Sequence, residues 1–225
     1  MTIAFSGASI SRRFFGNLIL AAAAIIGVSG GASGGARAAQ APSPKENKNL
    51  DLENTLYLDL EAGRVVINLR PDLAPKHVAR IKELARKGFY DGIVFHRVIE
   101  GFMAQTGDPK GNGTGGSGQN IPAEFNSGKH VRGALSMARS ANINSADSQF
   151  FIVTADSNFL DGQYTYWGEV VSGMEFVDKL RKGDPNENGA VPYPDRIIRL
   201  QVAADAEKNG TAKPAAPAAK PAPKN

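Results

Sequence analysis

The chain has 225 residues, of which 42% are hydrophobic and 21% charged, an ordinary composition for a globular protein. Its formal net charge is +4, but residues 1–38 contain three arginines and no acid, so the remainder carries only +1. That remainder contains no run of Lys and Arg, and nucleic-acid binding, which needs a concentrated basic face, is therefore not expected. The absence of cysteine excludes disulfides, a thiolate nucleophile and cysteine-ligated zinc. The three histidines show neither HxH nor HExxH spacing, so no metal is expected.

Residues 1–38 have the layout of a cleavable export signal. The pair Arg12 and Arg13 precedes an apolar stretch at residues 18–28, and small residues follow up to the A-x-A pattern at 36–38. The apolar stretch is shorter than the ~20 residues that a membrane-spanning helix needs. The paired arginines resemble a twin-arginine signal. We expect cleavage after Ala38, export by the twin-arginine route in preference to the general secretory route, a periplasmic location, and no stable membrane insertion after cleavage.

The rest of the chain divides by composition into three parts. Residues 39–53 combine Pro with charged residues and are predicted to be a linker. Residues 54–203 are predicted to form one folded domain. Residues 204–225 are rich in Ala, Pro and Lys and cannot bury enough apolar surface to offset the entropy of ordering, so a disordered tail is expected.

The domain begins with alternating patterns. Leucines at 56, 58 and 60 alternate with Tyr57, Asp59 and Glu61, and this period of two predicts a half-buried strand with those three residues on the other face. A turn at Ala62 and Gly63 leads to a second alternating run that ends at Pro71, which predicts a β-hairpin.

A helix is predicted to start at Pro75, whose missing N–H costs nothing in the first turn. Val78, Ile81 and Leu84 form its apolar face, and Gly88 stops it. A second helix is predicted from Met174 to Arg181. Further strands are predicted at Ile93–Val98, Met103–Thr106, Ala134–Met137, Phe150–Val153, Tyr164–Val170 and Arg196–Val202. About eight short strands and two helices favour an antiparallel barrel or sandwich, and the pattern alone does not decide between them.

Two motifs that could indicate other chemistry are weak. Residues 111–116 (GNGTGG) satisfy G-x-G-x-x-G, but the following SGQNIP cannot begin the helix that a phosphate site requires, so we expect a glycine loop with positive φ values. No serine lies in a G-x-S-x-G elbow or has an obvious base nearby in the sequence. A serine hydrolase is therefore not predicted, although triads can assemble from distant residues.

The most informative block is FHRVIEGFMAQTGD at residues 95–108. In a strand, Phe95 and Arg97 would share one face, with His96 and Val98 on the other. Burying an arginine among apolar residues costs free energy unless its guanidinium forms hydrogen bonds. Taken alone, however, Arg97 could equally lay its aliphatic stem over an apolar patch.

Several blocks in one order resemble the cyclophilins. They are FHRVIEGFMAQTGD, the stretch GNGTGG, GALSMA at 133–138 and SQFFI at 148–152, within a likeness that runs from about Thr55 to Val202. Residues 139–147 resemble the exported bacterial members. The resemblance implies a mainly β fold, an eight-stranded antiparallel β-barrel closed by two α-helices, with a groove on its outer surface that acts as a peptidyl-prolyl cis-trans isomerase.

The resemblance also implies the residues of that groove. Arg97 and Gln105 would be catalytic, and the substrate would be bound by Phe102, Met103, Ala138, Arg139, Ser140, Gln149, Phe151, Phe159, Leu160 and Tyr164. Three of these depart from the eukaryotic pattern, with Phe159 in place of Trp, Tyr164 in place of His and Arg139 in place of Asn. Phe lacks the indole N–H, so weak binding of cyclosporin is expected.

The expected activity is rotation about X–Pro bonds in exported, proline-containing polypeptides, without a cofactor and by a monomer. Arg97 would stabilise the twisted amide above an apolar proline pocket. One alternative is a chaperone or scaffold module that binds proline-containing segments in the same groove without turnover. The presence of both Arg97 and Gln105 favours the enzyme, since binding alone requires only the apolar pocket.

Overall fold

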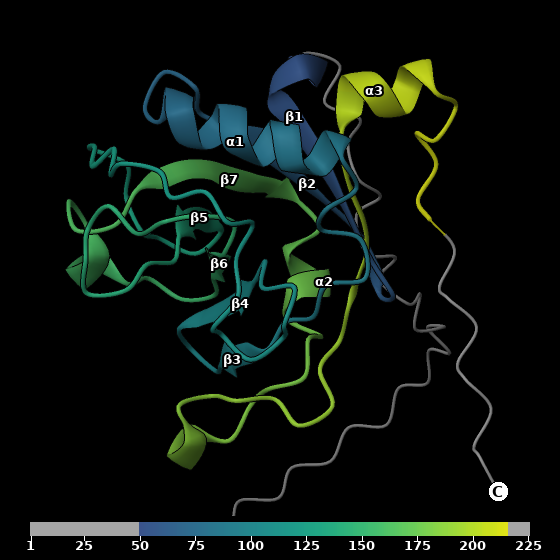
Figure 1. Cartoon of the computed structure of the whole chain (residues 1–225). Coiled ribbons are helices and arrows are strands. Elements are labelled where there is room, and N and C mark those ends of the chain that lie inside the picture. The colour runs from purple at the N-terminus through teal and green to yellow at the C-terminus, as the bar shows by residue number, and fades with distance from the viewer. Residues whose placement is uncertain (1–49, 216–225) are drawn as a thin grey trace, which may run out of the picture. The chain divides into compact units, whose positions relative to one another are not determined.

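The computed structural model describes residues 50–215 (Figure 1). The expected export signal at 1–38, residues 39–49 of the expected linker and residues 216–225 of the expected tail lie outside the described residues. The last part of the linker is folded, since the 3-10 helix η1 spans Leu52–Asn54.

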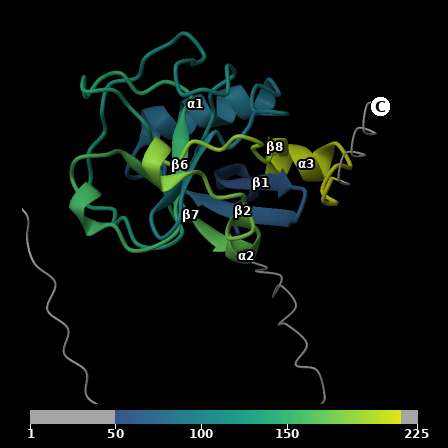
Figure 2. The same cartoon turned by 90° about the horizontal axis from the view of Figure 1, so that it is seen from below.

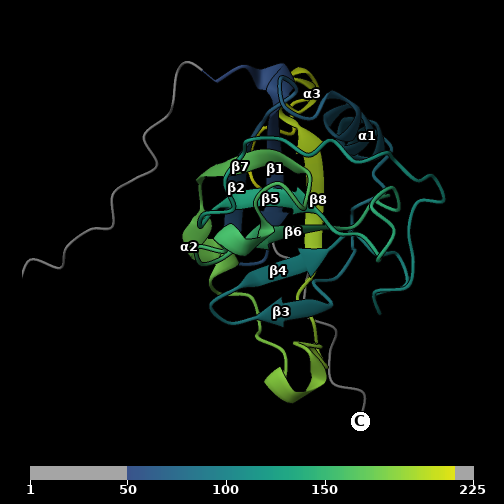
Figure 3. The ribbon, with the colours of Figure 1, turned by 90° about the vertical axis from the view of Figure 1, so that its left-hand side faces the viewer.

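Eight strands form one antiparallel sheet in the order β3-β4-β6-β5-β7-β2-β1-β8. They are β1 (Thr55–Leu60), β2 (Gly63–Leu69), β3 (Arg97–Ile99), β4 (Met103–Thr106), β5 (Ala134–Met137), β6 (Phe150–Val153), β7 (Tyr166–Ser172) and β8 (Ile197–Val202). The sheet curls until its two ends meet, because Val94, just before β3, bridges Arg196, just before β8 (Figure 3). The barrel-like alternative is therefore confirmed over the sandwich.

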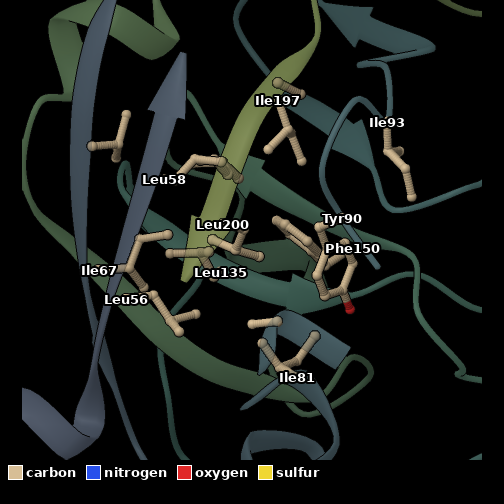
Figure 4. Packing of buried hydrophobic residues seen from close by; sticks show 14 of the residues in the cluster. Leu56, Leu58, Ile67, Ile81, Tyr90, Ile93, Leu135, Phe150, Ile197 and Leu200 are labelled. Carbon is tan, nitrogen blue, oxygen red and sulfur yellow. The ribbon is translucent and has the colours of Figure 1, made fainter. Parts of the chain in front are cut away.

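The interior of the curled sheet is filled by apolar side chains (Figure 4). Strand residues that point inward include Leu56, Leu58, Ile67, Leu135 and Leu200, each at most 1% exposed. Phe150 lies edge-on to both Tyr90 and Trp167, with ring centroids 5.6 Å and 5.4 Å away. One continuous cluster thus holds the first hairpin, the central strands and β8 together.

Two helices pack against the curled sheet (Figures 1 and 2), and both contribute to its interior cluster, through Ile81 and Val177 respectively. Helix α1 (Pro75–Arg86) starts and stops as predicted, with Gly88 at φ 65° just beyond its end. Helix α2 (Met174–Val177) is shorter than the predicted Met174–Arg181, and the chain continues in turns. Within residues 50–215, no helix is both long and apolar enough to cross a membrane.

The strand predicted at Ile93–Val98 is wrong over its first four residues. Only Arg97 and Val98 of that range belong to β3, and Phe95 and Val98 both lie in the interior cluster. Phe95 and Arg97 therefore do not share a face. The reason is the closing bridge at Val94, where the main chain bonds to the segment before β8 and leaves regular strand geometry.

Asp59 was expected on the exposed face of its strand, but it is 1% exposed. Its carboxylate accepts from Arg64 Nε at 2.7 Å, Arg199 Nη2 at 3.2 Å and the main-chain N–H of Ala215 at 3.0 Å. The chain that follows helix α3 (Ala203–Lys208) covers this carboxylate. The fold therefore continues beyond residue 203, where the tail was expected to begin.

Replacement of one central leucine tests the packing. Leu135→Ala should lower the free energy of unfolding by about 2–5 kcal/mol, because it removes a fully buried side chain of β5 and leaves a cavity. The matched control is Leu52→Ala, at a leucine that is 39% exposed, and chemical denaturation measures both. Equal losses in the two variants would contradict the assignment of the core.

Candidate active site

The outer face of the sheet carries a second apolar cluster. Along β4 and β6, Ala104 and Ile152 point into the barrel, so Met103, Phe151 and Val153 point to the other side. The residues of this outer cluster are Met103, Ala134, Phe151, Val153, Leu160 and Tyr166, with Leu73, Ile99, Phe102, Ala138 and Tyr164 packed against it. The structure therefore brings together six of the predicted substrate-binding residues, which are Phe102, Met103, Ala138, Phe151, Leu160 and Tyr164.

The strand register places the polar residues beside this cluster. Arg97 pairs with Gln105 across β3 and β4, Gln105 with Phe151 across β4 and β6, and Phe151 with Ser136 across β6 and β5. Residues that are opposite one another in a sheet project from the same face. A single row across four strands therefore leads from the Arg97 guanidinium to the apolar cluster.

Arg97 is half-buried and is held by uncharged acceptors. Its Nε donates to the main-chain oxygen of Asn188 at 2.9 Å and its Nη2 to Asn188 Oδ1 at 2.8 Å. Its Nη1 donates to Gln105 Oε1 at 3.2 Å and lies 3.9 Å from Met103 Sδ, at the edge of the apolar cluster. Burial lowers the pKa of Arg97, yet a guanidinium stays protonated in proteins. The site thus presents a positive charge that no carboxylate among these partners neutralises.

A one-directional chain of hydrogen bonds starts at Arg97. Gln105 accepts from Arg97 and donates through Nε2 to Gln149 Oε1 at 2.9 Å. Gln149 in turn donates to the main-chain oxygens of Gly113 at 3.1 Å and Gly115 at 2.7 Å. Each amide orientation is set by its neighbour, so the chain fixes both glutamines and ties Arg97 to the glycine-rich loop.

Three residues of the outer apolar cluster come from three separate segments. Met103 and Phe151 come from adjacent strands, and Leu160 ends the 3-10 helix η2 (Asn158–Leu160). Phe102 closes one side, and its ring lies 5.5 Å from that of Phe159. Phe159 is 64% exposed and therefore forms the rim.

Two of the residues that depart from the eukaryotic pattern pack together beside Phe151. The Arg139 guanidinium carbon lies 4.5 Å above the ring of Tyr164, whose edge meets Phe151 at 5.8 Å. Beside it is a hollow of about 290 Å³, lined by Gln105, Gly113, Thr114, Gly115, Ala138, Arg139, Ser140, Ser145, Asp147 and Gln149. Ser140 lies at its outer edge, exposed, with its hydroxyl 2.7 Å from that of Ser145.

The glycine-rich loop binds carboxylates of this chain. Asp108 accepts from the main-chain N–H groups of Lys110, Asn112 and Gly113, and Asp147 accepts from those of Ser117 and Gly118. Burial raises the pKa of Asp108, but these hydrogen bonds outweigh it and the pKa lies below its usual value. These five N–H groups are therefore engaged by the chain's own carboxylates, and Gly111 and Gly113 have the positive φ values expected of the loop.

A Ser-His-Asp arrangement does assemble in space, behind Phe151. His130 Nε2 lies 2.7 Å from Ser136 Oγ and its Nδ1 lies 3.0 Å from Asp161 Oδ1. Hydrogen bonds from the main chain and the ring of His130 lower the pKa of Asp161 to about 2. Ser136 and His130 are 0% exposed, however, so the hydroxyl meets no substrate. The chain of bonds instead supports the outer apolar cluster, since the His130 ring stacks on Phe151 with centroids 6.4 Å apart.

Sequence reasoning missed Asn188, His130 and Ser136. Asn188 contacts Arg97 from 91 residues away. The only local signal was the dipeptide Asn188-Gly189, which is typical of a left-handed turn. Within residues 50–215, no group of three or more His, Asp or Glu side chains is arranged to hold a metal ion.

Comparison with known proteins identifies the family. Residues 55–202 match the family model described as cyclophilin type peptidyl-prolyl cis-trans isomerase/CLD. A probable peptidyl-prolyl cis-trans isomerase of Brucella suis biovar 1 (strain 1330) is 54% identical over 198 residues, which cover 83% of this chain and 95% of the relative. Peptidyl-prolyl cis-trans isomerase B of Bacillus subtilis (strain 168) is 46% identical over 133 residues, or 58% of this chain and 92% of the relative.

Solved structures show the same likeness. A cyclophilin from Hirschia baltica has a TM-score of 0.62 and 27% identity, over 69% of this chain and 76% of that chain. A cyclophilin type isomerase of Cryptosporidium parvum, crystallised in the presence of the dipeptide Ala-Pro, has a TM-score of 0.61 and 28% identity. The match covers 66% of this chain and 98% of that chain. With the family model covering the whole barrel, the chain belongs to the cyclophilin-type peptidyl-prolyl cis-trans isomerases.

Proposed function

We propose that this protein accelerates rotation about X–Pro bonds in exported polypeptides, with Arg97 as the group that stabilises the twisted amide. The observation that carries the proposal is the position of an unneutralised guanidinium beside the apolar cluster of Met103 and Phe151. Membership of the family and the Ala-Pro dipeptide used with a related cyclophilin support a proline-containing ligand.

Rotation about an X–Pro bond has a high barrier but requires no covalent step. An amide is planar because its nitrogen shares a lone pair with the carbonyl, and rotation costs ~18–20 kcal/mol. For X–Pro the two planar isomers differ by only about 0.5–1 kcal/mol, yet their exchange takes tens to hundreds of seconds. No bond breaks, so acceleration requires only that the twisted state be bound more tightly than the planar ones.

The geometry fits this requirement. In the twisted state the nitrogen regains its lone pair and can accept a hydrogen bond from an Nη N–H of Arg97. Gln105 and Asn188 hold the guanidinium before substrate arrives, so little reorganisation is needed at the moment of rotation. Phe102, Phe151 and Leu160 would enclose the proline ring and exclude water, which strengthens the electrostatic interaction.

The hollow beside Arg139 supports binding of the residues next to the proline. Its lining offers main-chain groups at Ala138–Ser140 together with the Gln149 side chain. The alternative of a proline-binding chaperone would use the same surface, but it gives no role to the Arg97–Gln105–Gln149 chain.

Export is the second part of the proposal. It rests on the order of charge, apolar stretch and A-x-A pattern within residues 1–38. The substrates would then be polypeptides that fold after crossing the inner membrane, and the mature enzyme would act in the periplasm.

Replacement of Arg97 tests the mechanism. Arg97→Ala should lower the rate of cis-trans exchange of a short X–Pro peptide about 10²-fold, because one preorganised donor is lost. Arg97→Lys should also be slow, since lysine lacks the planar fork that both Asn188 and Gln105 engage. Exchange spectroscopy by NMR measures both, with peptide affinity determined in parallel.

Arg181→Ala, which removes a guanidinium that is 56% exposed and outside the groove, is the matched control and should leave exchange unchanged. Wild-type exchange in Arg97→Ala would contradict the mechanism. Retained suppression of client aggregation by an Arg97→Ala protein that no longer isomerises would favour the chaperone alternative.

The rim residue Phe159 should determine cyclosporin affinity. Phe159→Trp restores an indole N–H at an exposed position, and one hydrogen bond of about 1 kcal/mol corresponds to roughly fivefold tighter binding. Calorimetric titration of the wild type and the variant measures this. An unchanged affinity would show that the rim does not contact the drug in this protein.

The export signal can be tested separately from catalysis. Replacing both Arg12 and Arg13 by Lys should retain the precursor in the cytoplasm, while the wild type should accumulate in the periplasm with Ala39 as its first residue. Cell fractionation and mass spectrometry of the mature chain measure both. A wild-type chain that stays cytoplasmic would refute export, and normal export of the double variant would refute the twin-arginine route.

A further inference from the structure

The loop between α2 and β8 lies along the free edge of β3 (Figures 1 and 3). Gly183 donates to Val98 O and Val98 donates to Gly189 O, both at 2.8 Å, while Arg97 forms a bridge with Ala190. The loop also closes on itself, since Asp184 bridges Ala190. Residues 183–190, with the 3-10 helix η3 (Pro185–Glu187) at their tip, therefore act as a short extra ribbon on the edge strand that carries Arg97.

Asn188 has an unusual backbone conformation within this ribbon. Its φ of 55° and ψ of 30° are left-handed, and among residues 50–215 it is the only non-glycine residue with positive φ. Such a conformation is disfavoured for most L-residues, and asparagine tolerates it better than others. Backbone strain of this kind concentrates at functional sites. Here it turns two oxygen atoms of one residue toward the same guanidinium.

The two oxygens hold one edge of the Arg97 guanidinium. The main-chain oxygen accepts from Nε at 2.9 Å, and Oδ1 accepts from Nη2 at 2.8 Å. Gln105 holds the remaining nitrogen, Nη1, from the other side. A planar group with all three nitrogens engaged has its plane fixed, whereas Gln105 alone would leave it free to rotate.

The chemical nature of Asn188 matters as much as its position. An aspartate in its place would also accept two hydrogen bonds, but it would neutralise the charge that stabilises the twisted amide. An amide oxygen fixes the guanidinium and leaves its charge available. All three oxygen acceptors around Arg97 share this property, since they are a main-chain carbonyl and two side-chain amides.

We propose that Asn188 is a positioning residue for isomerisation, and that the ribbon at 183–190 is part of the catalytic apparatus because it delivers Asn188 to Arg97. The inference rests on the proposed role of Arg97. Asn188 acts through the guanidinium and has no contact with the proline pocket of its own.

The decisive variant is Asn188→Gly. Glycine adopts φ 55° without strain and keeps the main-chain oxygen, so of the two oxygens that accept from Arg97 the substitution removes only Oδ1, together with the rest of the side chain. We expect kcat for exchange of an X–Pro peptide to fall about tenfold while KM changes less than about twofold. Asn209→Gly, at an exposed asparagine that follows α3 and lies outside the groove and the ribbon, is the matched control and should retain wild-type kcat.

A double-mutant cycle separates positioning from a general loss of structure. Asn188→Gly should have no further effect in the Arg97→Ala background, because the group that it positions is absent. Wild-type kcat in Asn188→Gly would overturn the inference. An equal fold-loss of kcat on adding Asn188→Gly to the wild type and to Arg97→Ala would also overturn it. If the glycine variant loosens the ribbon, as judged by the amide spectra of Val98 and Gly183, Asn188→Asp provides a second test, because aspartate also tolerates the left-handed conformation and keeps both acceptor oxygens. Its charge should lower kcat by neutralising Arg97, and it should have no such effect in the Arg97→Ala background; an unchanged kcat would overturn the inference.

Failure of this inference is distinguishable from failure of the proposed function. If Arg97→Ala alone keeps wild-type exchange, the mechanism itself is wrong. If Arg97→Ala is inactive and Asn188→Gly is fully active, the mechanism stands and only the positioning role is refuted.

Discussion

The pairing register of β3, β4, β6 and β5 is the constraint on which the site depends. Because side chains alternate between the two faces of a strand, one register fills the barrel with Val98, Ala104, Ile152 and Leu135. The same register aligns Arg97, Gln105, Phe151 and Ser136 on the outer face. A shift of one residue in any of these strands would move its core side chains to the outer face and its site side chains into the interior. The packing of the interior therefore also fixes the positions of the catalytic row.

The second requirement is to keep a guanidinium half-buried without neutralising it. A carboxylate partner would satisfy the donors but remove the field that acts on the substrate. The protein uses neutral acceptors instead, and it anchors each of them in turn. Gln105 is fixed by Gln149, Gln149 by the carbonyls of the glycine-rich loop, and Asn188 by a ribbon paired to β3.

The glycine-rich loop therefore has a structural task in the catalytic site. Its N–H groups bind Asp108 and Asp147, which leaves carbonyl oxygens free to accept from Gln149. The glycines allow this close approach, since a Cβ at Gly115 or Gly116 would overlap those carboxylates. A motif that resembles a phosphate site thus serves as an internal scaffold for the Arg97 network.

Local pattern determined much of this protein. Alternating leucines predicted the first hairpin, Pro75 and Gly88 predicted the bounds of α1, and the ordered blocks from Thr55 to Val202 predicted the family and its groove residues. The hairpin and the helix bounds depend on neighbours in the sequence, where burial and propensity act directly, whereas the groove residues followed from the resemblance to the family. The burial of Asp59, the Ser136–His130–Asp161 chain behind Phe151 and the contact of Asn188 with Arg97 were decided only by the tertiary structure. Each joins segments that are far apart in the sequence, and which segments meet depends on the strand order and the path of the loops, about which periodicity carries no information.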